Sequence, residues 1–355
     1  MSSNRVEKWQ LEAFKTLPLT YHCLAIEITN CCNAQCAICY QSAEKLNSPS
    51  AIDLSEEDAK VAIGDIATVP TVYKRFHLAG GEAFLDLDKC IRIFEYAKKQ
   101  GYFEITATTN AFWAKNLSKA NKIAKNLSKA GVTGLEVSTD YWHQQYVSPT
   151  AIDNCVTACK RANIKVILRI LSTKHHPIGE VFASLRPQTL GTVDVIACGN
   201  VFRTGKAKQE VTRIEVQERT IDFPCCSVLN LSVNAAGKVA PCCAGLDQSA
   251  LSFGNVKQKS IAEIVKLMNG SQIARILAFF GTSFFLPILE RAGINIGKKE
   301  DFTTACELCA AIFSHPSHIE VIENYLKELR KRSVLEAINY LKRETATVEE
   351  TSRIA

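Results

Sequence analysis

Residues 31–40 read CCNAQCAICY, which places four cysteines within nine positions. Three of them, Cys32, Cys36 and Cys39, have the spacing C-x3-C-x2-C. Three thiolates on one short loop can bind three irons of a cubane cluster, and the fourth iron then has no protein ligand and is free to bind a substrate or a cofactor. The sequence therefore predicts an open iron–sulfur site on this loop, with Cys31 as a spare, buried thiol.

Two other uses of these cysteines fit the loop less well. A structural zinc site usually has four ligands in two C-x2-C pairs, and this loop supplies three at a different spacing. A disulfide framework is typical of small secreted scaffolds, and fifteen cysteines in 355 residues are well below that density. The loop is therefore interpreted as an iron–sulfur site, with zinc as the alternative.

The cysteine spacing resembles the cluster loop of the radical S-adenosylmethionine (radical SAM) superfamily. The resemblance implies a [4Fe-4S] cluster whose open iron is chelated by the amino and carboxylate groups of SAM. One electron from the reduced cluster cleaves the bond between sulfur and C5′, and the resulting 5′-deoxyadenosyl radical abstracts a hydrogen atom from the substrate. The family chemistry also implies a reducing electron donor such as a flavodoxin or a ferredoxin.

The composition is that of an ordinary globular protein. It is 47% hydrophobic and 22% charged, with a mean hydropathy near zero and a net charge of +6. This charge is modest and spread along the chain, so we expect no nucleic-acid partner. The most apolar region, 276–289, is shorter than a membrane span, and nothing reads as a signal peptide. We therefore expect no membrane contact and a cytoplasmic location, where thiols stay reduced.

Strand and helix patterns alternate through the first two hundred residues. An apolar run at 23–28 leads directly into the cluster loop. Later strands are expected at 75–79, 102–107, 134–138, 165–171 and 193–197. Helices are expected between them, at 55–66, 87–99, 114–130, 151–162 and 181–185. The alternation predicts a parallel sheet with ligands at the carboxyl ends of its strands, and six units predict an α/β fold with a partial (β/α)6 TIM-like barrel, as in radical SAM proteins.

Residues that resemble SAM contacts follow the predicted strands. Gly80, Gly81 and Glu82 resemble the GGE motif of the superfamily, in which glycines let the backbone approach the methionine group and the carboxylate accepts hydrogen bonds from its ammonium. The resemblance implies that further cofactor contacts come from Ile38, Tyr40, Thr109, Asn110, Ser138, Asp140 and Arg169. For the polar members, a capping or turn role is the alternative.

Two of these residues carry specific expectations. Arg169 resembles the arginine that pairs with the carboxylate of SAM, a task that suits a planar guanidinium. Ile38 stands where the superfamily often has an aromatic residue on the adenine, and we expect the isoleucine to pack there.

A second group of cysteines follows the predicted barrel. Its predicted metal ligands are Cys225, Cys242, Cys306 and Cys309. Their spacing resembles SPASM and twitch auxiliary domains, and the resemblance implies an auxiliary [4Fe-4S] cluster. No cysteine follows Cys309, which favours the twitch pattern. The neighbours Cys226 and Cys243 are alternative ligands, and a four-cysteine zinc site is the alternative to the cluster.

These patterns divide the chain into four parts. We expect an N-terminal helix at 1–20, the radical SAM barrel at 21–207 and a SPASM/twitch-like α+β domain at 208–315. A helical tail at 316–355 has apolar residues at amphipathic spacing.

The resemblance to radical SAM proteins with an auxiliary domain implies that the substrate is a ribosomal peptide, which is crosslinked or epimerised in natural-product biosynthesis. A sugar or an aminocyclitol, acted on by a dehydrogenase or an epimerase, is the alternative small-molecule substrate. The thirty residues before Cys31 are too few for a fused leader-peptide domain, so a separate leader-peptide-binding protein would supply that function. The alternative of another class is a non-catalytic iron–sulfur or zinc module.

An epimerase needs a thiol that returns a hydrogen atom to the substrate radical. Cys198 follows the sixth predicted strand, so we expect it to face the site as this catalytic residue, with Cys226 and Cys243 as further candidates. The alternative is that buried cysteines commonly act as small apolar residues. Tyr141, Trp142 and His143 follow Asp140 and are expected to line the substrate pocket.

Overall fold

The computed structural model describes residues 18–216, 221, 224–242, 246 and 249–329. The predicted N-terminal helix before residue 18 and the end of the predicted tail after residue 329 lie outside the described residues. Among the described helices, none is long and apolar enough to cross a membrane.

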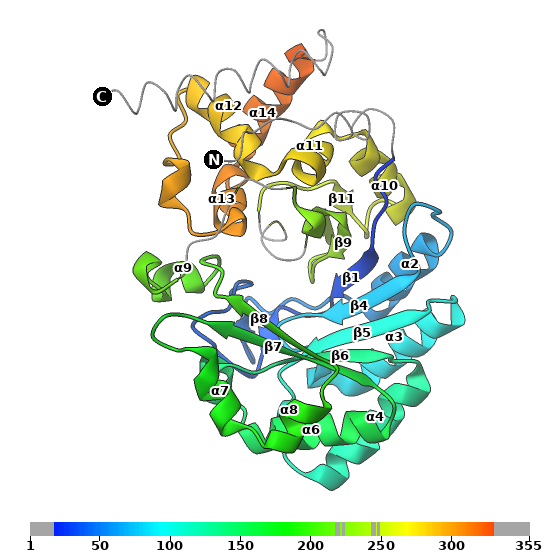
Figure 1. Cartoon of the computed structure of the whole chain (residues 1–355). Helices are drawn as coiled ribbons and strands as arrows, with labels where there is room; N and C mark the ends of the chain where they lie inside the picture. Colours follow the sequence, from blue (N-terminus) through cyan, green and yellow to red (C-terminus); the bar gives the residue numbers. More distant parts are fainter. Residues whose placement is uncertain (1–17, 217–220, 222–223, 243–245, 247–248, 330–355) are drawn as a thin grey trace.

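One mostly parallel sheet organises the described part of the chain (Figure 1). Its strand order is β11-β10-β9-β1-β4-β5-β6-β7-β8. The parallel barrel strands are β1 (Cys23–Glu27), β4 (Arg75–Ala79), β5 (Glu104–Thr109), β6 (Gly134–Ser138), β7 (Lys165–Ser172) and β8 (Val195–Asn200). The C-terminal half adds β9 (Asn230–Val233), which is parallel to β1, and the antiparallel β10 (Lys238–Ala240) and β11 (Gly254–Asn255). The two halves of the chain therefore share one sheet.

Helices cover one face of the barrel strands (Figure 1). They are α2 (Glu56–Ile66), α3 (Leu87–Lys99), α4 (Leu117–Ala130), α6 (Pro149–Arg161), α7 (Ile178–Ser184) and α8 (Pro187–Thr192). The main hydrophobic core lies between these helices and the sheet.

Side chains alternate between the two faces of each strand. Phe76 and Leu78 of β4 are at most 1% exposed and belong to the main core, so they mark the covered face. We call the other face of the barrel strands the open face. Its partly exposed or exposed polar side chains are His77, Thr106, Thr108, Glu136 and Arg169. The open face is therefore polar where the covered face is apolar.

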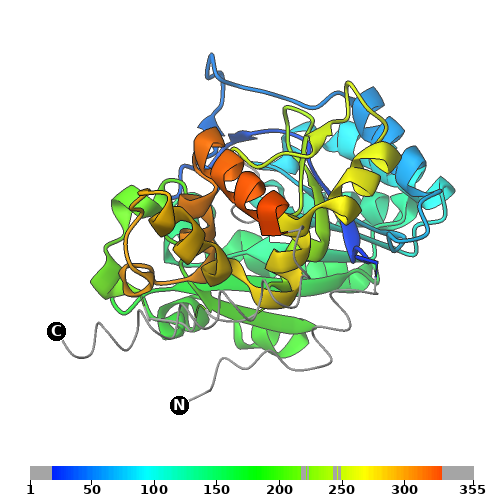
Figure 2. The same cartoon turned by 90° about the horizontal axis from the view of Figure 1, so that it is seen from above.

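The C-terminal half forms a second core over the sheet. Its helices are α10 (Ile261–Gly270), α11 (Gln272–Phe280), α12 (Leu286–Arg291), α13 (Ala305–Ile312) and α14 (Pro316–Leu329). Apolar side chains of α11 to α14 make up most of this core. Seen from above, these helices overlie the sheet (Figure 2).

Shorter elements complete the described chain. The cluster loop contains a two-stranded parallel sheet of β2 (Cys31–Cys32) and β3 (Glu44–Lys45). Two four-residue helices are α5 (Tyr141–Gln144) and α9 (Ala207–Glu210). The 3-10 helices are Ala83–Asp86, Phe112–Ala114, Arg213–Glu215, Cys226–Leu229, Thr282–Phe285 and Lys299–Asp301.

The predicted fold class is confirmed, because a partial TIM-like barrel of parallel strands is followed by a smaller C-terminal domain.

The bounds of several helices and strands differ from the prediction. The helix predicted from residue 114 begins at Leu117, because the side chain of Asn116 accepts hydrogen bonds from the backbone N–H groups of Ser118 and Lys119. The last barrel strand lies at Val195–Asn200 rather than 193–197, since α8 extends to Thr192. The domain boundaries stay predictions.

Candidate active site

The cluster loop leaves the carboxyl end of β1 and brings three thiols together. Cys32 and Cys36 are buried and Cys39 is partly exposed. The N–H of Ala34 donates to Cys32 Sγ at 3.3 Å, and the N–H of Ala43 donates to Cys39 Sγ at 3.4 Å. Burial, with smaller contributions from the Glu82 carboxylate and the Cys36 and Cys39 thiols, raises the pKa of the Cys32 thiol to about 12. The loop therefore already directs backbone donors at two of the predicted ligands.

The three thiols of the loop can supply the ligands of an iron–sulfur cluster. Within the described residues, no group of three or more His, Cys, Asp or Glu side chains is arranged around one metal ion. Each thiolate of a cubane cluster binds a different iron. Three neighbouring thiols with N–H···S hydrogen bonds are thus a suitable donor set for an iron–sulfur cluster.

The two glycines of the GGE motif pack on the backbone of the cluster loop. The N–H of Gly81 donates to Thr29 O, and the N–H of Glu82 donates to Cys31 O, both at 2.8 Å. A Cβ atom on Gly81 would lie 2.2 Å from Cys31 O, and one on Gly80 would lie 2.8 Å from Thr29 O. Glycine is therefore required here for contact between two backbone segments, a reason that the sequence analysis did not identify.

The carboxylate of Glu82 joins three segments. It is buried and accepts hydrogen bonds from the N–H of Phe84 at 3.1 Å, the N–H of Asn110 at 2.7 Å and the hydroxyl of Thr109 at 2.9 Å. Burial raises the pKa of Glu82 to about 7, although these hydrogen bonds oppose the shift. The Thr109 hydroxyl also accepts from Trp113 Nε1 at 3.1 Å, so it is engaged within the protein.

Asn110 connects the end of β5 to the cluster loop. Its Nδ2 donates to Asn33 Oδ1 at 3.0 Å and lies 3.8 Å from Cys32 Sγ. Its Oδ1 accepts from the N–H of Phe112 at 3.0 Å. The amide is therefore fixed at both ends beside a predicted cluster ligand.

Asp140 follows β6 and caps α5. One oxygen, Oδ1, accepts from the N–H groups of Trp142 and His143 and lies 2.8 Å from His143 Nδ1. The other, Oδ2, is buried and has no hydrogen-bond partner among the described residues. Burial lowers the pKa of His143, but the Asp140 carboxylate and the Cys36 thiol together raise it well above the usual range. An acceptor is thus left for a ligand within reach of the cluster loop.

Ser138 and Arg169 are register partners on β6 and β7. The Arg169 side chain is 46% exposed, and its Nη2 donates to Glu136 Oε2 at 2.9 Å. The predicted arginine therefore lies on the open face with a carboxylate partner from the neighbouring strand. Nothing in the sequence pattern indicates this partner.

Ile38 and Tyr40 flank Cys39 in the cluster loop. Ile38 is buried and belongs to a small cluster with Trp142, Val201 and Val216. Tyr40 is partly exposed, and a Cβ atom on Gly205 would lie 2.2 Å from its carbonyl oxygen. Both residues therefore help to pack the loop, and their contacts with SAM stay predictions.

Cys198 does not have the expected orientation. Its register partner in β7 is Ile170, a fully buried residue of the main core. Paired residues of parallel strands point to the same face, so Cys198 faces the covered side, opposite Arg169. It is exposed because β8 is the edge strand. The expectation that this thiol faces the site is therefore wrong.

The four predicted auxiliary ligands come from three segments of the C-terminal half. Cys225 precedes a 3-10 helix, Cys242 follows β10, and Cys306 and Cys309 lie on α13. Burial raises the pKa of Cys309 well above its usual range, and the nearby Cys242, Cys306 and Cys225 raise it further. The other three predicted ligands therefore lie in the neighbourhood of Cys309. The side chain of Cys226 and all of Cys243 lie outside the described residues, so the choice within each pair stays a prediction.

Sequence reasoning missed two sets of polar residues. On the open face, His77 lies between the hydroxyls of Thr106, at 2.8 Å, and Thr108, at 2.9 Å. Polar residues at alternate positions of otherwise apolar strands were the available signal. The other set is a largely buried ion pair between Arg203 and Glu307. Glu307 lies in the sequence between Cys306 and Cys309, two predicted ligands.

Comparisons with known proteins agree with this arrangement. The model of the radical SAM superfamily matches residues 26–181, and that of the SPASM iron–sulfur cluster-binding domain matches residues 225–310. The chain is 22% identical over 316 residues to the "Putative peptide biosynthesis protein YydG" of Bacillus subtilis (strain 168), which covers 86% of this chain and 96% of the relative. It is 34% identical over 119 residues to the "Probable GTP 3',8-cyclase" of Methanocaldococcus jannaschii, covering 33% and 36% of the two chains.

A solved structure has the same fold. "Native anSMEcpe with bound AdoMet" superposes with a TM-score of 0.51 at 14% identity, covering 90% of this chain and 100% of the other. Both domain models match where the cysteine loop and the four-cysteine group lie, and these domains imply a SAM-binding [4Fe-4S] cluster and auxiliary iron–sulfur clusters. The chain therefore has a radical SAM domain at residues 26–181 and a SPASM domain at residues 225–310.

Proposed function

We propose that this protein is a radical SAM maturase that modifies a ribosomal peptide. The observation that carries the proposal is the similarity over 86% of the chain to a relative whose name refers to peptide biosynthesis. The paired radical SAM and SPASM domains support radical chemistry on that substrate.

In this proposal, Cys32, Cys36 and Cys39 hold the SAM-binding cluster. Their proximity on one loop and the N–H···S hydrogen bonds support the assignment. When bound, the cluster and SAM supply a 5′-deoxyadenosyl radical that abstracts a hydrogen atom from the peptide. The auxiliary cluster is assigned to Cys225, Cys242, Cys306 and Cys309.

SAM is proposed to lie at the carboxyl ends of β4 to β7. Asp140 supports this position because its Oδ2 is a buried acceptor with no partner among the described residues. Asn110 supports it because its amide is fixed beside Cys32. The backbone of Gly80–Glu82 holds the cluster loop against the same strand ends.

The peptide is proposed to enter beside Tyr141 and His176. These rings are stacked, with centroids 3.5 Å apart and planes at 11°, and Tyr141 is exposed. The adjacent Trp142 carbonyl accepts from Cys36 Sγ at 3.7 Å, which brings the aromatic pair near the cluster loop. Stacked aromatic rings present a rigid apolar surface with a polar edge, which suits a peptide side chain.

A reduced flavodoxin or ferredoxin is the proposed electron donor, and a separate leader-peptide-binding protein is the proposed partner for substrate delivery.

Crosslinking is preferred to epimerisation by Cys198, because that thiol faces away from the open face. The two reactions differ in product mass, since a crosslink removes two hydrogen atoms and an epimerisation removes none.

The test is anaerobic reconstitution of the full chain, followed by reduction with SAM. We expect about eight irons per chain, as two [4Fe-4S] clusters require, and formation of 5′-deoxyadenosine. Cys36→Ala should abolish that product. Cys31→Ala is the matched control, because Cys31 is a buried cysteine of the same loop that is not assigned as a ligand. Product formation by Cys36→Ala would refute the cluster assignment.

The peptide assignment has its own test. Synthetic precursor peptides that carry a leader segment are incubated with the reduced enzyme and analysed by mass spectrometry. A product lighter by two hydrogen atoms supports crosslinking. SAM cleavage that is stimulated by aminocyclitols or sugars and not by any peptide would contradict the proposed substrate class.

A further inference from the structure

The segment that follows β8 is fastened to the cluster loop. Gly205 has a φ of +57°, and a Cβ atom there would lie 2.2 Å from Tyr40 O, so only glycine allows this contact. The N–H of Lys206 donates to Cys39 O at 2.9 Å. Lys206 Nζ donates to Gln35 Oε1 at 2.7 Å and to Ala43 O at 2.8 Å. One end of this segment is therefore fixed against the loop that carries Cys36 and Cys39.

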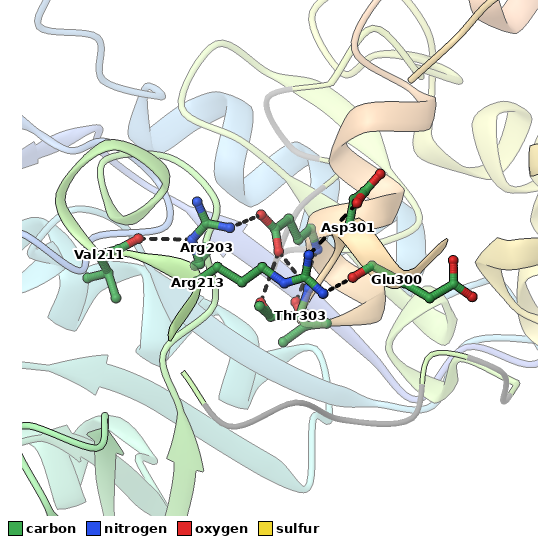
Figure 3. A network of polar contacts seen from close by, with 8 residues as sticks. Arg203, Val211, Arg213, Glu300, Asp301 and Thr303 are labelled. Atoms are coloured by element: carbon green, nitrogen blue, oxygen red, sulfur yellow. Dashed lines mark hydrogen bonds and ion pairs between the residues drawn. The ribbon is translucent and has the colours of Figure 1, made fainter. Parts of the chain in front are cut away.

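The same segment reaches the helix of the auxiliary cysteines. Arg203, three residues before Lys206, pairs through Nη1 with Glu307 Oε1 at 2.7 Å (Figure 3). Glu307 lies between Cys306 and Cys309 on α13. A few residues of chain therefore connect the loop of one proposed cluster with the ligand helix of the other.

The ion pair is largely buried, and both side chains make further hydrogen bonds. The Arg203 side chain is 17% exposed and that of Glu307 is 6% exposed. Arg203 Nε also donates to Val211 O at 2.9 Å. Glu307 Oε2 accepts from the N–H and the hydroxyl of Thr303, each at 2.9 Å. Removing one partner of such a pair leaves an uncompensated buried charge, so the two groups hold each other in one geometry.

We propose that Arg203 is a positioning residue for the auxiliary cluster. It holds the first turn of α13, so that Cys306 and Cys309 stay aligned with Cys225 and Cys242. It also neutralises the carboxylate of Glu307 beside the cluster. This inference rests on the ligand assignment of the proposed function.

The proposal predicts opposite electrostatic effects for the two partners. The reduction potential of an iron–sulfur cluster depends on the net charge around it. Arg203→Gln leaves the negative charge of Glu307, which stabilises the oxidised cluster and lowers the potential. Glu307→Gln leaves the positive charge of Arg203 and raises the potential. The double variant removes both charges and should have a potential near that of the wild type.

Arg213 supplies a matched control from the same segment. It pairs with Asp301 at 3.8 Å and donates to the carbonyl of Glu300, just before α13 (Figure 3). These side chains are 39% and 58% exposed for Arg213 and Asp301, so water and salt screen their charges. Arg213→Gln should leave the iron content and the potential of the auxiliary cluster unchanged.

The experiment is a redox titration of the reconstituted full chain, followed by electron paramagnetic resonance with and without SAM. The signal that SAM does not perturb reports the auxiliary cluster. We expect a lower potential in Arg203→Gln, a higher one in Glu307→Gln, and wild-type behaviour in Arg203→Lys and Arg213→Gln. Shifts of the same sign in the two single neutral variants, or no shift in either, would overturn the proposal.

Loss of the auxiliary iron in Arg203→Gln would not end the test. Recovery of that iron in Arg203→Lys or in the double neutral variant then supports the proposal, and failure of both to recover it overturns the proposal. A wild-type protein with about four irons per chain refutes the ligand assignment and this inference together. With about eight irons in the wild type, a missing opposite shift refutes this inference alone.

Discussion

The backbone N–H of Glu82 donates a hydrogen bond to the carbonyl oxygen of Cys31 at 2.8 Å. With the bond from Gly81 to Thr29, it joins the end of β4 to the start of the cluster loop. The GGE motif therefore helps to shape the cluster loop. Substitutions in this motif should impair assembly of the iron–sulfur cluster more directly than they impair binding of SAM.

Gly81→Ala should reduce the iron content of the SAM cluster and lower 5′-deoxyadenosine formation at least about tenfold. The added Cβ would lie 2.2 Å from Cys31 O, and backbone must move at a cost of about 1–3 kcal/mol. Iron analysis and product quantification after reconstitution measure both effects. Gly179→Ala is the control, since nothing lies within 4 Å of a Cβ there. Equal iron in the two variants would contradict the prediction.

Glu82→Gln should destabilise the protein by about 1–3 kcal/mol. The carboxylate accepts from three donors, and an amide turns one acceptor oxygen into a donor that faces another donor. The measurement is the melting temperature of reconstituted protein. Glu57→Gln, at an exposed position, should leave this temperature nearly unchanged. A wild-type melting temperature in Glu82→Gln would mean that its hydrogen bonds contribute little.

Asp140→Asn should weaken SAM binding about tenfold. The remaining side-chain oxygen can still cap α5, whereas the unpartnered Oδ2 is replaced by a donor and a charge-assisted hydrogen bond is lost. Titration of SAM into reconstituted protein measures the change in Kd. Asp86→Asn, which alters the capping aspartate of α3, should bind SAM normally. Unchanged affinity in Asp140→Asn would remove Asp140 from the proposed SAM site.

Cys306→Ala should lose about half of the iron while SAM cleavage without peptide continues. The reason is that the two proposed clusters have separate ligand sets, one on the loop after β1 and one that includes α13. Cys198→Ala is the matched control and should retain all iron and all peptide product, because its thiol faces the covered side of the sheet. A peptide product lost in Cys198→Ala would restore that residue as a hydrogen-atom donor.

The cysteine spacings and the alternation of apolar residues were sufficient to predict the barrel and its cluster loop. The barrel strands β1, β4, β5, β6 and β7 each have a buried apolar set, such as Phe76 and Leu78 of β4, that the period of two reveals. The orientation of Cys198 was not predictable in this way. Val195 and Ile196 are both apolar and both exposed on the edge strand, so the sequence of β8 does not indicate which face is covered.

Non-local contacts were also beyond prediction. The four residues of β9 carry no signal that names β1 as their partner, although Leu24 pairs with Leu231 across two hundred residues of sequence. The contact between Arg203 and Glu307 is of the same kind, since each residue alone resembles a solvated charge. Such pairs can be identified only in the folded structure, where the two halves of the chain are packed together.

The pairing of β1 with β9 has a consequence for how the protein is made. β1 lies in the interior of the finished sheet, between β4 and β9, but its second neighbour is synthesised only at residues 230–233. Until the ribosome has passed that point, one edge of β1 has no partner strand, and an unpaired edge is a template for aggregation. The SPASM half therefore completes the barrel as well as carrying the auxiliary site, and a barrel truncated before residue 230 would expose its first strand to neighbouring chains.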